Sequence, residues 1–562
     1  MLKASGFCVC CLSALLLSVG CGGSTNGTNE GSGGGGGSGV GGTGNGGAGG
    51  EPPGYSSQVD LLLVVDNSAG TKAHHERLAE SAGDLIRRLQ NPDCVGGDGS
   101  RRTPSDPGEA CPEGTERLHA PVSDLNVGVI TSSLGTAGGD YCQGQNDQAH
   151  LLPTLRDSLE GASPEGVYEL REGGDVEGLI GGVQDAIRST GQSGCGFEMP
   201  LEAMFRFLAD PKPYGSLERR PCSADDSANA CVEFAGTDEA LLAQRAAFLR
   251  PGSTVVVVMV GDENDCSVVA GGQSWIGLDD HVLQPRPTQT CATDPNSECC
   301  YSCQQAQKAG CPSLETECTA PTPNDELNLR CWDQKRRLGI DFLYPVDRYV
   351  AALRSKTIDH DDESLVNALF ADGTRSTKQV HFLTLGGAPP GYLTEMNADG
   401  TTRNLSNAEL ASSDLWAQLV GDPSSYKPPQ DPFMVESDLP RTGVSKLNGI
   451  SPADTNAVNG GDEANAGYRL QYACLDPLSG PLECPAGDFC LCDKPDGNAA
   501  CSSSGLQIAA PAYPTLRQFA VAQQAGGEIG SLCEYGKVPD RVDTGFGASY
   551  ELLQQALEST VR

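Results

Sequence analysis

The sequence predicts an α/β protein, built on a doubly wound and mostly parallel sheet that carries large disulfide-rich loop insertions. Short apolar runs, typical of strands buried on both faces, alternate with segments whose apolar residues recur at helical spacing. Between them lie long stretches rich in Pro, Gly, Asp and Cys that have no regular apolar pattern. Because strand and helix signals recur on both sides of these stretches, we interpret them as insertions in one domain.

The first half of this domain supplies three predicted strands and four predicted helices. Apolar runs predict strands at Val59–Asp66, Asp124–Thr131 and Thr254–Asp262, two of which end in a carboxylate. Helical spacing predicts helices over about 72–90, over about 176–187, from Pro200 through Leu208, and from a cap at Thr237 to about Leu249.

The second half repeats the alternation with larger interruptions. We expect helices at Pro345–Ser355, Tyr513–Gln524 and Ala548–Ser559, and strands at Gln379–Leu385 and Glu528–Leu532. The domain as a whole is predicted to span residues 58–562, with insertions at about 92–121, 263–343 and 389–505. Loops of this length usually have a function or need their own stabilisation.

Residues 1–21 have the pattern of a secretory signal. Lys3 precedes the apolar segment 12–19, which is too short to span a bilayer, and Gly20 then precedes Cys21. This ending resembles the lipobox of bacterial lipoproteins, although Ser18 stands where that motif usually has Leu. The resemblance implies lipidation of Cys21 and, from the residue that follows it, an outer-membrane location. An ordinary cleaved signal with an incidental cysteine is the alternative.

The next segment, residues 22–57, is a predicted flexible tether. Glycine supplies 17 of the 29 residues from 22 to 50, and Gly/Ser-rich chains behave as flexible coils. Its r.m.s. reach is roughly 30–36 Å. A lipid anchor followed by a tether predicts a protein held at the cell envelope that acts at a distance from the membrane.

The charge balance excludes two classes of partner. The chain has 38 Lys+Arg and 74 Asp+Glu, so its formal net charge is 38 − 74 = −36. Nucleic acids and anionic lipid surfaces are bound through basic faces, so neither is an expected partner. The membrane is therefore expected to be reached only through the lipid anchor, and the partner to be a protein or another surface ligand.

The cysteine content points to an oxidising compartment. Four of the 24 cysteines lie in the signal segment, which leaves 24 − 4 = 20, an even number that predicts disulfides. Structural zinc is the alternative for Cys299-Cys300-x-x-Cys303 and Cys490-x-Cys492. Neither run is followed by a second cysteine pair or by histidines at the usual spacing, and the pairing of the cysteines cannot be derived from sequence.

Acidic and hydroxyl residues follow two of the buried strands. Asp66-Asn67-Ser68 follows the first strand, and Asp262-Glu263-Asn264-Asp265 follows the third. In open α/β sheets, ligands bind beyond the carboxyl ends of the strands. We therefore expect a candidate site where these two groups of residues meet.

These segments resemble a von Willebrand factor A domain. VDLLLVVDNSAG, followed by an amphipathic helix, is similar to the opening of that family, in which the first strand runs into the D-x-S-x-S motif of a metal-ion-dependent adhesion site. By this resemblance Asp66 and Ser68 match the first two positions of the motif, and Asp262, after VVVVMVG, matches the final aspartate. The resemblance covers the scaffold, roughly half of the chain, and none of the insertions.

Two positions depart from the family pattern. Gly70 stands where the second serine is expected, although Thr71 offers a neighbouring hydroxyl, and the family's loop threonine has no clear counterpart near 196–198. Glu198 would replace the neutral hydroxyl ligand that is lost at Gly70 by a charged one.

The resemblance implies a divalent cation, Mg²⁺, Mn²⁺ or Ca²⁺, on oxygen ligands, with no organic cofactor. The cation could bridge to a partner, serve only the structure, or be absent from a degenerate site in which Asp66 caps the next helix.

Other motifs are weaker. His74-His75-Glu76 lacks the spacing of a zinc motif and is interpreted as a solvated or half-buried helix start. Glu395-x-Asn397-x-Asp399-Gly400 resembles a calcium loop, but Ser406 stands where a bidentate carboxylate is needed, which favours a turn. No nucleophile elbow, phosphate loop or dinucleotide fingerprint occurs, so the sequence gives no support for an enzyme.

The sequence therefore predicts a membrane-tethered, extracytoplasmic binding or adhesion protein that contacts its partner near Asp66, Ser68 and Asp262. A surface hydrolase with its site in the insertions, and a purely structural envelope protein, are the alternatives.

Overall fold

The computed structural model describes residues 57–561 except 98, 140, 143, 222–230, 271–284, 320–325, 361–362, 397–401, 465–468, 484–490, 493–496 and 535–545. The predicted signal segment, Cys21 and all but the last residue of the predicted tether lie outside the described residues. Asn397, Asp399 and Gly400 of the motif that begins at Glu395 also lie outside them.

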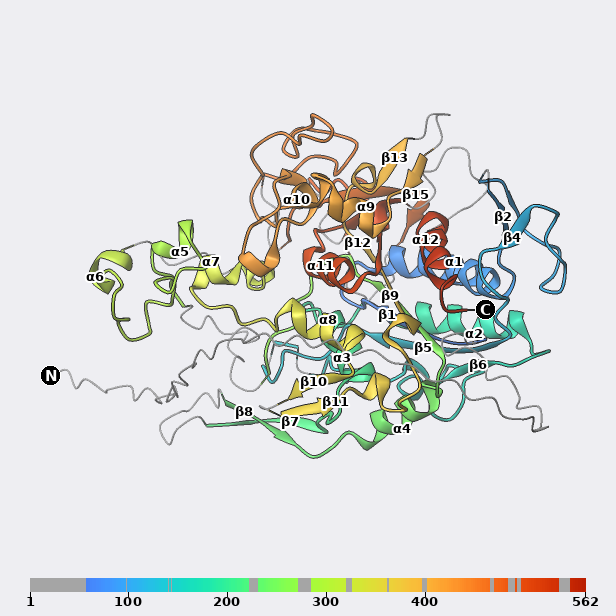
Figure 1. Ribbon diagram of the computed structural model, residues 1–562. Helices are drawn as coiled ribbons and strands as arrows, with labels where there is room; N and C mark the ends of the chain where they lie inside the picture. The colour runs from blue at the N-terminus through green and yellow to red at the C-terminus, as the bar shows by residue number, and fades with distance from the viewer. Residues whose placement is uncertain are drawn as a thin grey trace, which may run out of the picture. The chain divides into compact units, whose positions relative to one another are not determined.

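A six-stranded, mostly parallel sheet forms the centre of the domain (Figure 1). Its strands, in the order in which they lie, are β17 (Glu528–Ser531), β12 (Val380–Gly386), β9 (Thr254–Val260), β1 (Gln58–Val65), β5 (Asp124–Thr131) and β6 (Tyr168–Leu170). All neighbours are parallel except β5 and β6, which are antiparallel. The predicted α/β class and the mostly parallel sheet are confirmed, whereas the short antiparallel edge strand β6 was not predicted.

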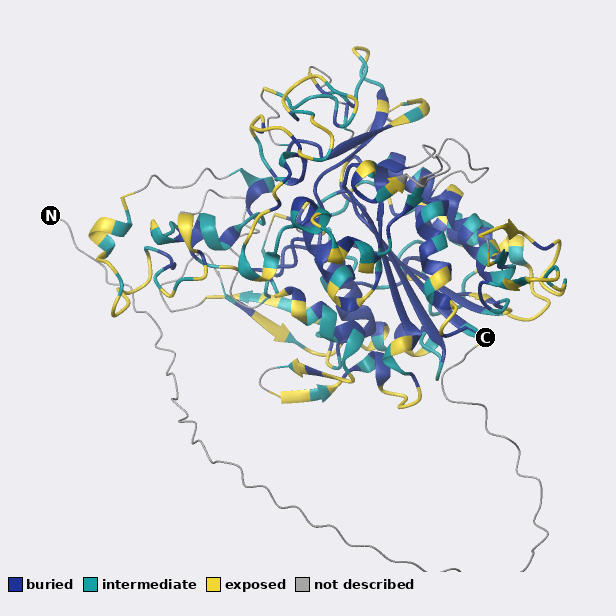
Figure 2. Ribbon diagram, turned by 45° about the horizontal axis from the view of Figure 1, so that its top comes forward, coloured by how far each residue is buried: buried dark blue, intermediate teal, exposed yellow. Residues whose placement is uncertain are grey.

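Helices cover both faces of this sheet, as the alternation of side chains along β1 requires. Leu61, Leu63 and Val65 pack with α1 (Lys72–Gln90), α2 (Val176–Arg188) and α12 (Gly547–Leu557). Leu62 and Val64 face the opposite way and pack with α3 (Pro200–Leu208), α4 (Glu239–Phe248), α8 (Val346–Arg354) and α11 (Leu516–Ala525). Figure 2 shows the strands as the most deeply buried part of the molecule. In the described part of the chain, no helix has both the length and the apolar composition needed to cross a membrane.

One predicted helix cap is wrong. Helix α4 is capped by Asp238 and not by Thr237, because the Asp238 carboxylate accepts a hydrogen bond from the Leu241 amide at 3.0 Å. The same carboxylate also accepts a hydrogen bond from Arg206 at 2.7 Å. Asp238, one residue after Thr237, therefore provides the hydrogen-bond acceptor for the first turn of α4. The same carboxylate binds Arg206 of α3.

The segments between the scaffold elements contain small sheets and short helices. The small sheets pair β2 (Cys94–Gly96) with β3 (Arg101–Arg102) and β4 (Thr115–Arg117), β7 (Ser216–Arg220) with β8 (Cys231–Ala235), β10 (Thr357–His360) with β11 (Glu363–Val366), β13 (Thr394–Met396) with β14 (Thr402–Asn404), and β15 (Cys474–Leu482) with β16 (Gln507–Ala512). The short helices are α5 (Thr290–Thr293), α6 (Leu314–Glu317), α7 (Gln334–Leu338), α9 (Asn407–Ser412) and α10 (Leu415–Leu419). Most of these elements are too short to be stable alone.

Disulfides stabilise these segments, as the cysteine count predicts. The described residues contain eight: Cys94–Cys111, Cys142–Cys195, Cys266–Cys331, Cys291–Cys300, Cys299–Cys311, Cys303–Cys318, Cys474–Cys533 and Cys492–Cys501. The zinc interpretation of Cys299, Cys300 and Cys303 is wrong, because each of the three is bonded to a different cysteine elsewhere in the chain. Cys490 lies outside the described residues.

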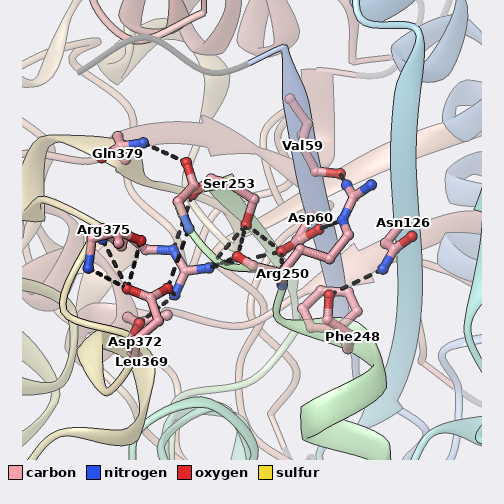
Figure 3. Close-up of polar contacts among 12 residues, drawn as sticks. Val59, Asp60, Asn126, Phe248, Arg250, Ser253, Leu369, Asp372, Arg375 and Gln379 are labelled. Atoms are coloured by element: carbon pink, nitrogen blue, oxygen red, sulfur yellow. Dashed lines mark hydrogen bonds and ion pairs between the residues drawn. The ribbon is translucent and has the colours of Figure 1, made fainter. Parts of the chain in front are cut away.

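A buried ion pair fixes the amino ends of the strands β1, β5 and β9 (Figure 3). Asp60 on β1 is fully buried and accepts hydrogen bonds from the Arg250 amide at 2.9 Å, from Arg250 Nε at 2.7 Å and from the Ser253 hydroxyl. Arg250 also binds Asp124 at the start of β5. Arg375 donates to the Ser253 carbonyl at 3.0 Å and lies 3.9 Å from Asp60. One carboxylate thus joins the starts of β1, β5 and β9.

We expect the Asp60→Asn variant to lose about 3–5 kcal/mol of unfolding free energy, because the buried Arg375 and the largely buried Arg250 then lose a charged partner. Urea unfolding of the oxidised protein measures this loss. Glu169→Gln is the control, since the exposed ion pair of Glu169, on β6, with Arg171 is worth less than about 1 kcal/mol. A loss below 1 kcal/mol in Asp60→Asn would show that the network is not needed for stability.

Candidate functional site

The candidate site lies where the strands β1 and β9 end side by side. The two strands pair in register up to Val65 and Val260, and the Asp66 amide donates to the Val260 carbonyl at 2.9 Å. The chain starts the sheet at β1, builds outward through β5 and β6, and then returns to β9 on the other side of β1. Ligands of doubly wound sheets bind at such a switch point, beyond the carboxyl ends of the strands.

Asp66 is held by the turn that follows β1 and by the end of β5. Its Oδ1 accepts hydrogen bonds from the Ser68 amide at 2.8 Å and from the Ser132 hydroxyl at 3.3 Å. Its Oδ2 is buried and has no hydrogen-bond partner. Asp66 does not cap α1, because the cap position is occupied by Thr71 and no side chain accepts a hydrogen bond there. The capping interpretation of Asp66 is therefore wrong.

The structure brings Asp262 and Glu198 to the same place. Asp66 and Glu198 both lie close enough to Asp262 to raise its pKa, and Ser68 lies beside Glu198. Both carboxyl groups are buried, and each has one oxygen without a partner, Oδ1 of Asp262 and Oε1 of Glu198. All four predicted residues are thus neighbours.

Two further residues belong to this group and were not named from the sequence. Ser132 comes from the hydroxyl-rich run 131–133 at the end of β5, and that run is the signal by which it could have been found. Glu263 lies beside Glu198 and is half-buried. We call Asp66, Ser68, Ser132, Glu198, Asp262 and Glu263 the strand-end group.

Gly70 cannot be replaced by serine without strain. Its φ is +100°, a conformation that side chains with a Cβ rarely adopt. The neighbouring hydroxyl of Thr71 donates to the Ser68 carbonyl at 2.8 Å and is therefore engaged within the turn. The hydroxyl that approaches Asp66 comes instead from Ser132, on another strand.

Burial raises the pKa of three carboxyl groups well above the usual range. For Asp262 the neighbouring Asp66 and Glu198 raise the pKa further, and for Glu198 the neighbours are Glu263 and Asp66. The pKa of Glu263 is raised by burial and by Asp262 and Asp66. Such a group requires either protons or a cation to balance its charge.

The oxygens around Asp66 fit a hard cation with only two charged ligands. Across the described ranges, no three His, Cys, Asp or Glu side chains are placed to hold one metal ion. Asp66 and Asp262 are two carboxylates, however, and Ser68 and Ser132 are two hydroxyls beside them. Mg²⁺ and Ca²⁺ accept such oxygen ligands and complete their coordination with water.

Three disulfides hold the loops around this group. Cys142–Cys195 fixes the loop that leads to Glu198, and Cys266–Cys331 fixes the loop that follows Asp262. Cys474–Cys533 joins β15 to the segment directly after β17. The strand-end group is therefore surrounded by covalently restrained backbone.

The predicted helix start at His74-His75-Glu76 is present in α1, but the prediction that it is solvated or half-buried is wrong for the two histidines. Both imidazoles are buried, because α1 packs its first turn against the strand ends. His75 Nε2 is 2.6 Å from the Asp66 carbonyl oxygen, and His74 Nε2 is 2.7 Å from the Pro511 carbonyl oxygen. Burial lowers the pKa of His74 to about 3, so its imidazole is neutral. These histidines position the site backbone.

Ser406 also has a structural role. It is the N-cap of α9, where its hydroxyl accepts from the Glu409 amide and Glu409 accepts in return from the Ser406 amide. It does not test the turn expected at Glu395–Gly400, because residues 397–401 lie outside the described part of the chain.

Comparisons with protein-family models, with curated proteins and with solved structures find no match for this chain.

We expect the metal-free protein to lose stability as the pH rises from about 5 to 8. The folded protein retains protons on Glu198, Asp262 and Glu263 that the unfolded chain has already lost, so folding is favoured at the lower pH. Each retained proton contributes a slope of about 1.4 kcal/mol per pH unit. Urea unfolding in EDTA measures the slope, which Glu198→Gln should reduce. A flat profile, or an unchanged slope in the variant, would contradict this explanation.

Proposed function

We propose that this protein is an exported, membrane-tethered binding or adhesion protein of the von Willebrand factor A-like type. In this proposal the strand-end group binds a divalent cation, and the surrounding face contacts a protein or another surface ligand. The strand order and the positions of Asp66, Ser68 and Asp262 at the switch point support the fold assignment. The eight disulfides are consistent with an extracytoplasmic location.

The observation that carries the proposal is the pair of orphaned carboxylate oxygens at the switch point. Asp66 Oδ2 and Asp262 Oδ1 are both buried without a hydrogen-bond partner, although the two side chains lie beside each other. A buried polar atom without a partner costs about 1–3 kcal/mol, and more when it is charged. A bound cation would remove that cost for both oxygens.

The residues of the strand-end group would have different roles in binding the cation. Asp66 and Asp262 would supply the negative charge, and Ser68 and Ser132 would supply neutral oxygens. The cation would then present its remaining coordination positions to water or to an oxygen ligand of the partner. His75, which contacts the Asp66 carbonyl, would keep the backbone in place.

The attachment to the membrane rests on the N-terminal sequence. Lipidation at Cys21 and a Gly-rich tether of 36 residues, 22–57, would place the domain roughly 30–36 Å from the bilayer. Anchoring in an outer membrane would leave the strand-end face free to meet ligands outside the membrane plane.

We expect Mg²⁺, Mn²⁺ or Ca²⁺ to raise the thermal unfolding temperature of the oxidised protein above its value in EDTA. A cation at 100 times its Kd stabilises the folded state by about 2.7 kcal/mol. In Asp66→Ala the increase should disappear, because one of the two charged ligands is gone.

Glu534→Gln is the matched control for this experiment. Glu534 is a buried carboxyl group beyond the end of β17, where burial raises its pKa to about 7. Its replacement should leave the response to cations intact. If no cation stabilises the wild type, or if Asp66→Ala responds equally, the strand-end group is not a cation site.

A further inference from the structure

A hollow beside the strand-end group is lined by three carboxyl side chains. Glu198 and Glu263 come from the scaffold loops, and Glu436 comes from the long segment between β14 and β15. Glu198 and Glu436 are buried, and Glu198 Oε1 has no hydrogen-bond partner. Asn264 donates to Glu436 Oε1 at 2.6 Å. Burial raises the pKa of Glu436 to about 8, although the Asn264 hydrogen bond and the charges of Arg337 and Arg517 act to lower it.

A second, apolar cleft of about 90 Å³ adjoins this hollow. Trp332 and Tyr426 line it together with Leu343, Pro428 and Leu516, and Asp341 lies beside Tyr426. The two hollows have Asn264 and Cys331 in common, so those residues form the wall between them. Gln334 of α7 and Leu516 and Arg517 of α11 are among its lining residues.

The walls of both hollows are held in place. The Cys266–Cys331 disulfide fixes the shared wall, and the Arg517 amide donates to Asn264 Oδ1 at 2.9 Å. Arg336 donates to the Tyr426 carbonyl at 2.9 Å, which ties the two sides of the cleft together. A preformed site of this kind costs little ordering when a partner binds.

The lining selects the chemistry of the partner. A primary ammonium group has three donors and no acceptor, so it matches a small hollow with three carboxyl acceptors. A guanidinium group is planar and larger, and fits such a hollow less well. The adjoining cleft suits an apolar or aromatic side chain. The net charge of −36 attracts a basic partner over long distances.

We propose that the two hollows together recognise a partner protein that presents a lysine side chain beside an apolar one. The lysine ammonium binds among Glu198, Glu263 and Glu436, and the apolar side chain occupies the cleft of Trp332 and Tyr426. This inference rests on the proposed function in one respect, because it names the partner of the contact face described above. It does not require the cation.

The test is a selection from a random peptide library on the oxidised protein, at pH 7.5 and 0.15 M salt in EDTA. We expect enrichment of peptides in which a lysine adjoins an apolar residue. In a selected peptide, lysine acetylation or replacement by arginine should weaken binding at least tenfold, measured by fluorescence anisotropy. Peptides without lysine, or equal binding after acetylation, would overturn the proposal.

Two variants locate the binding. Glu436→Gln should weaken the selected peptides at least tenfold, because glutamine cannot provide the negative charge, and it preserves the protonated shape that Glu436 has in the free protein. Glu172→Gln removes one exposed negative charge from the surface and should leave the affinity unchanged. Equal affinity in wild type and Glu436→Gln would refute the assignment. Asp66→Ala tests the cation separately, so failure of either proposal is recognised independently of the other.

Discussion

The ion pair between Asp60 and Arg250 is the interaction on which the geometry of the rest depends. It holds the start of β1 to the connection between α4 and β9 and, through Asp124, to the start of β5. In parallel strands, a register that is fixed at one end is fixed at the other. Asp66 and Asp262 therefore meet beyond the far ends of β1 and β9, with Ser132 beside them. A slip of one residue would turn Leu61, Leu63 and Val65 to the wrong face and separate these oxygens.

The two ends of the sheet differ in whether a buried carboxyl group has a cationic partner. At the amino ends of the strands, Asp60 is neutralised by Arg250, with Arg375 close by. At the carboxyl ends, the described residues place no arginine or lysine in an ion pair with Asp66, Glu198, Asp262 or Glu263. Buried charge without a partner destabilises a fold and is retained mainly at functional sites. The difference between the two ends therefore favours a functional interpretation of the carboxyl ends.

Much of this architecture could be predicted, because local patterns determine it. The apolar runs give β1, β5, β9, β12 and β17, helical spacing gives α1 over the residues predicted for it, and the strand-end aspartates follow from the same runs. What could not be predicted depends on tertiary contacts. Strand β6 has only three residues and pairs antiparallel with β5. Burial of His74 and His75 depends on segments more than a hundred residues away, such as Pro511 and Thr190. Glu436 reaches the site only because a long insertion folds back over the strand ends.

The insertions complete the face that the scaffold begins. A doubly wound sheet supplies few side chains at its carboxyl edge, and long polar loops cannot hold a defined shape without further restraint. Here Cys266–Cys331 and Cys474–Cys533 attach the inserted segments to residues that directly follow β9 and β17. Asn264 then connects Arg517 of α11 to Glu436 of the insertion. The insertions can therefore differ in sequence at the surface of the hollows while the strand-end group keeps its geometry, as is expected of a scaffold that changes its ligand without changing its fold.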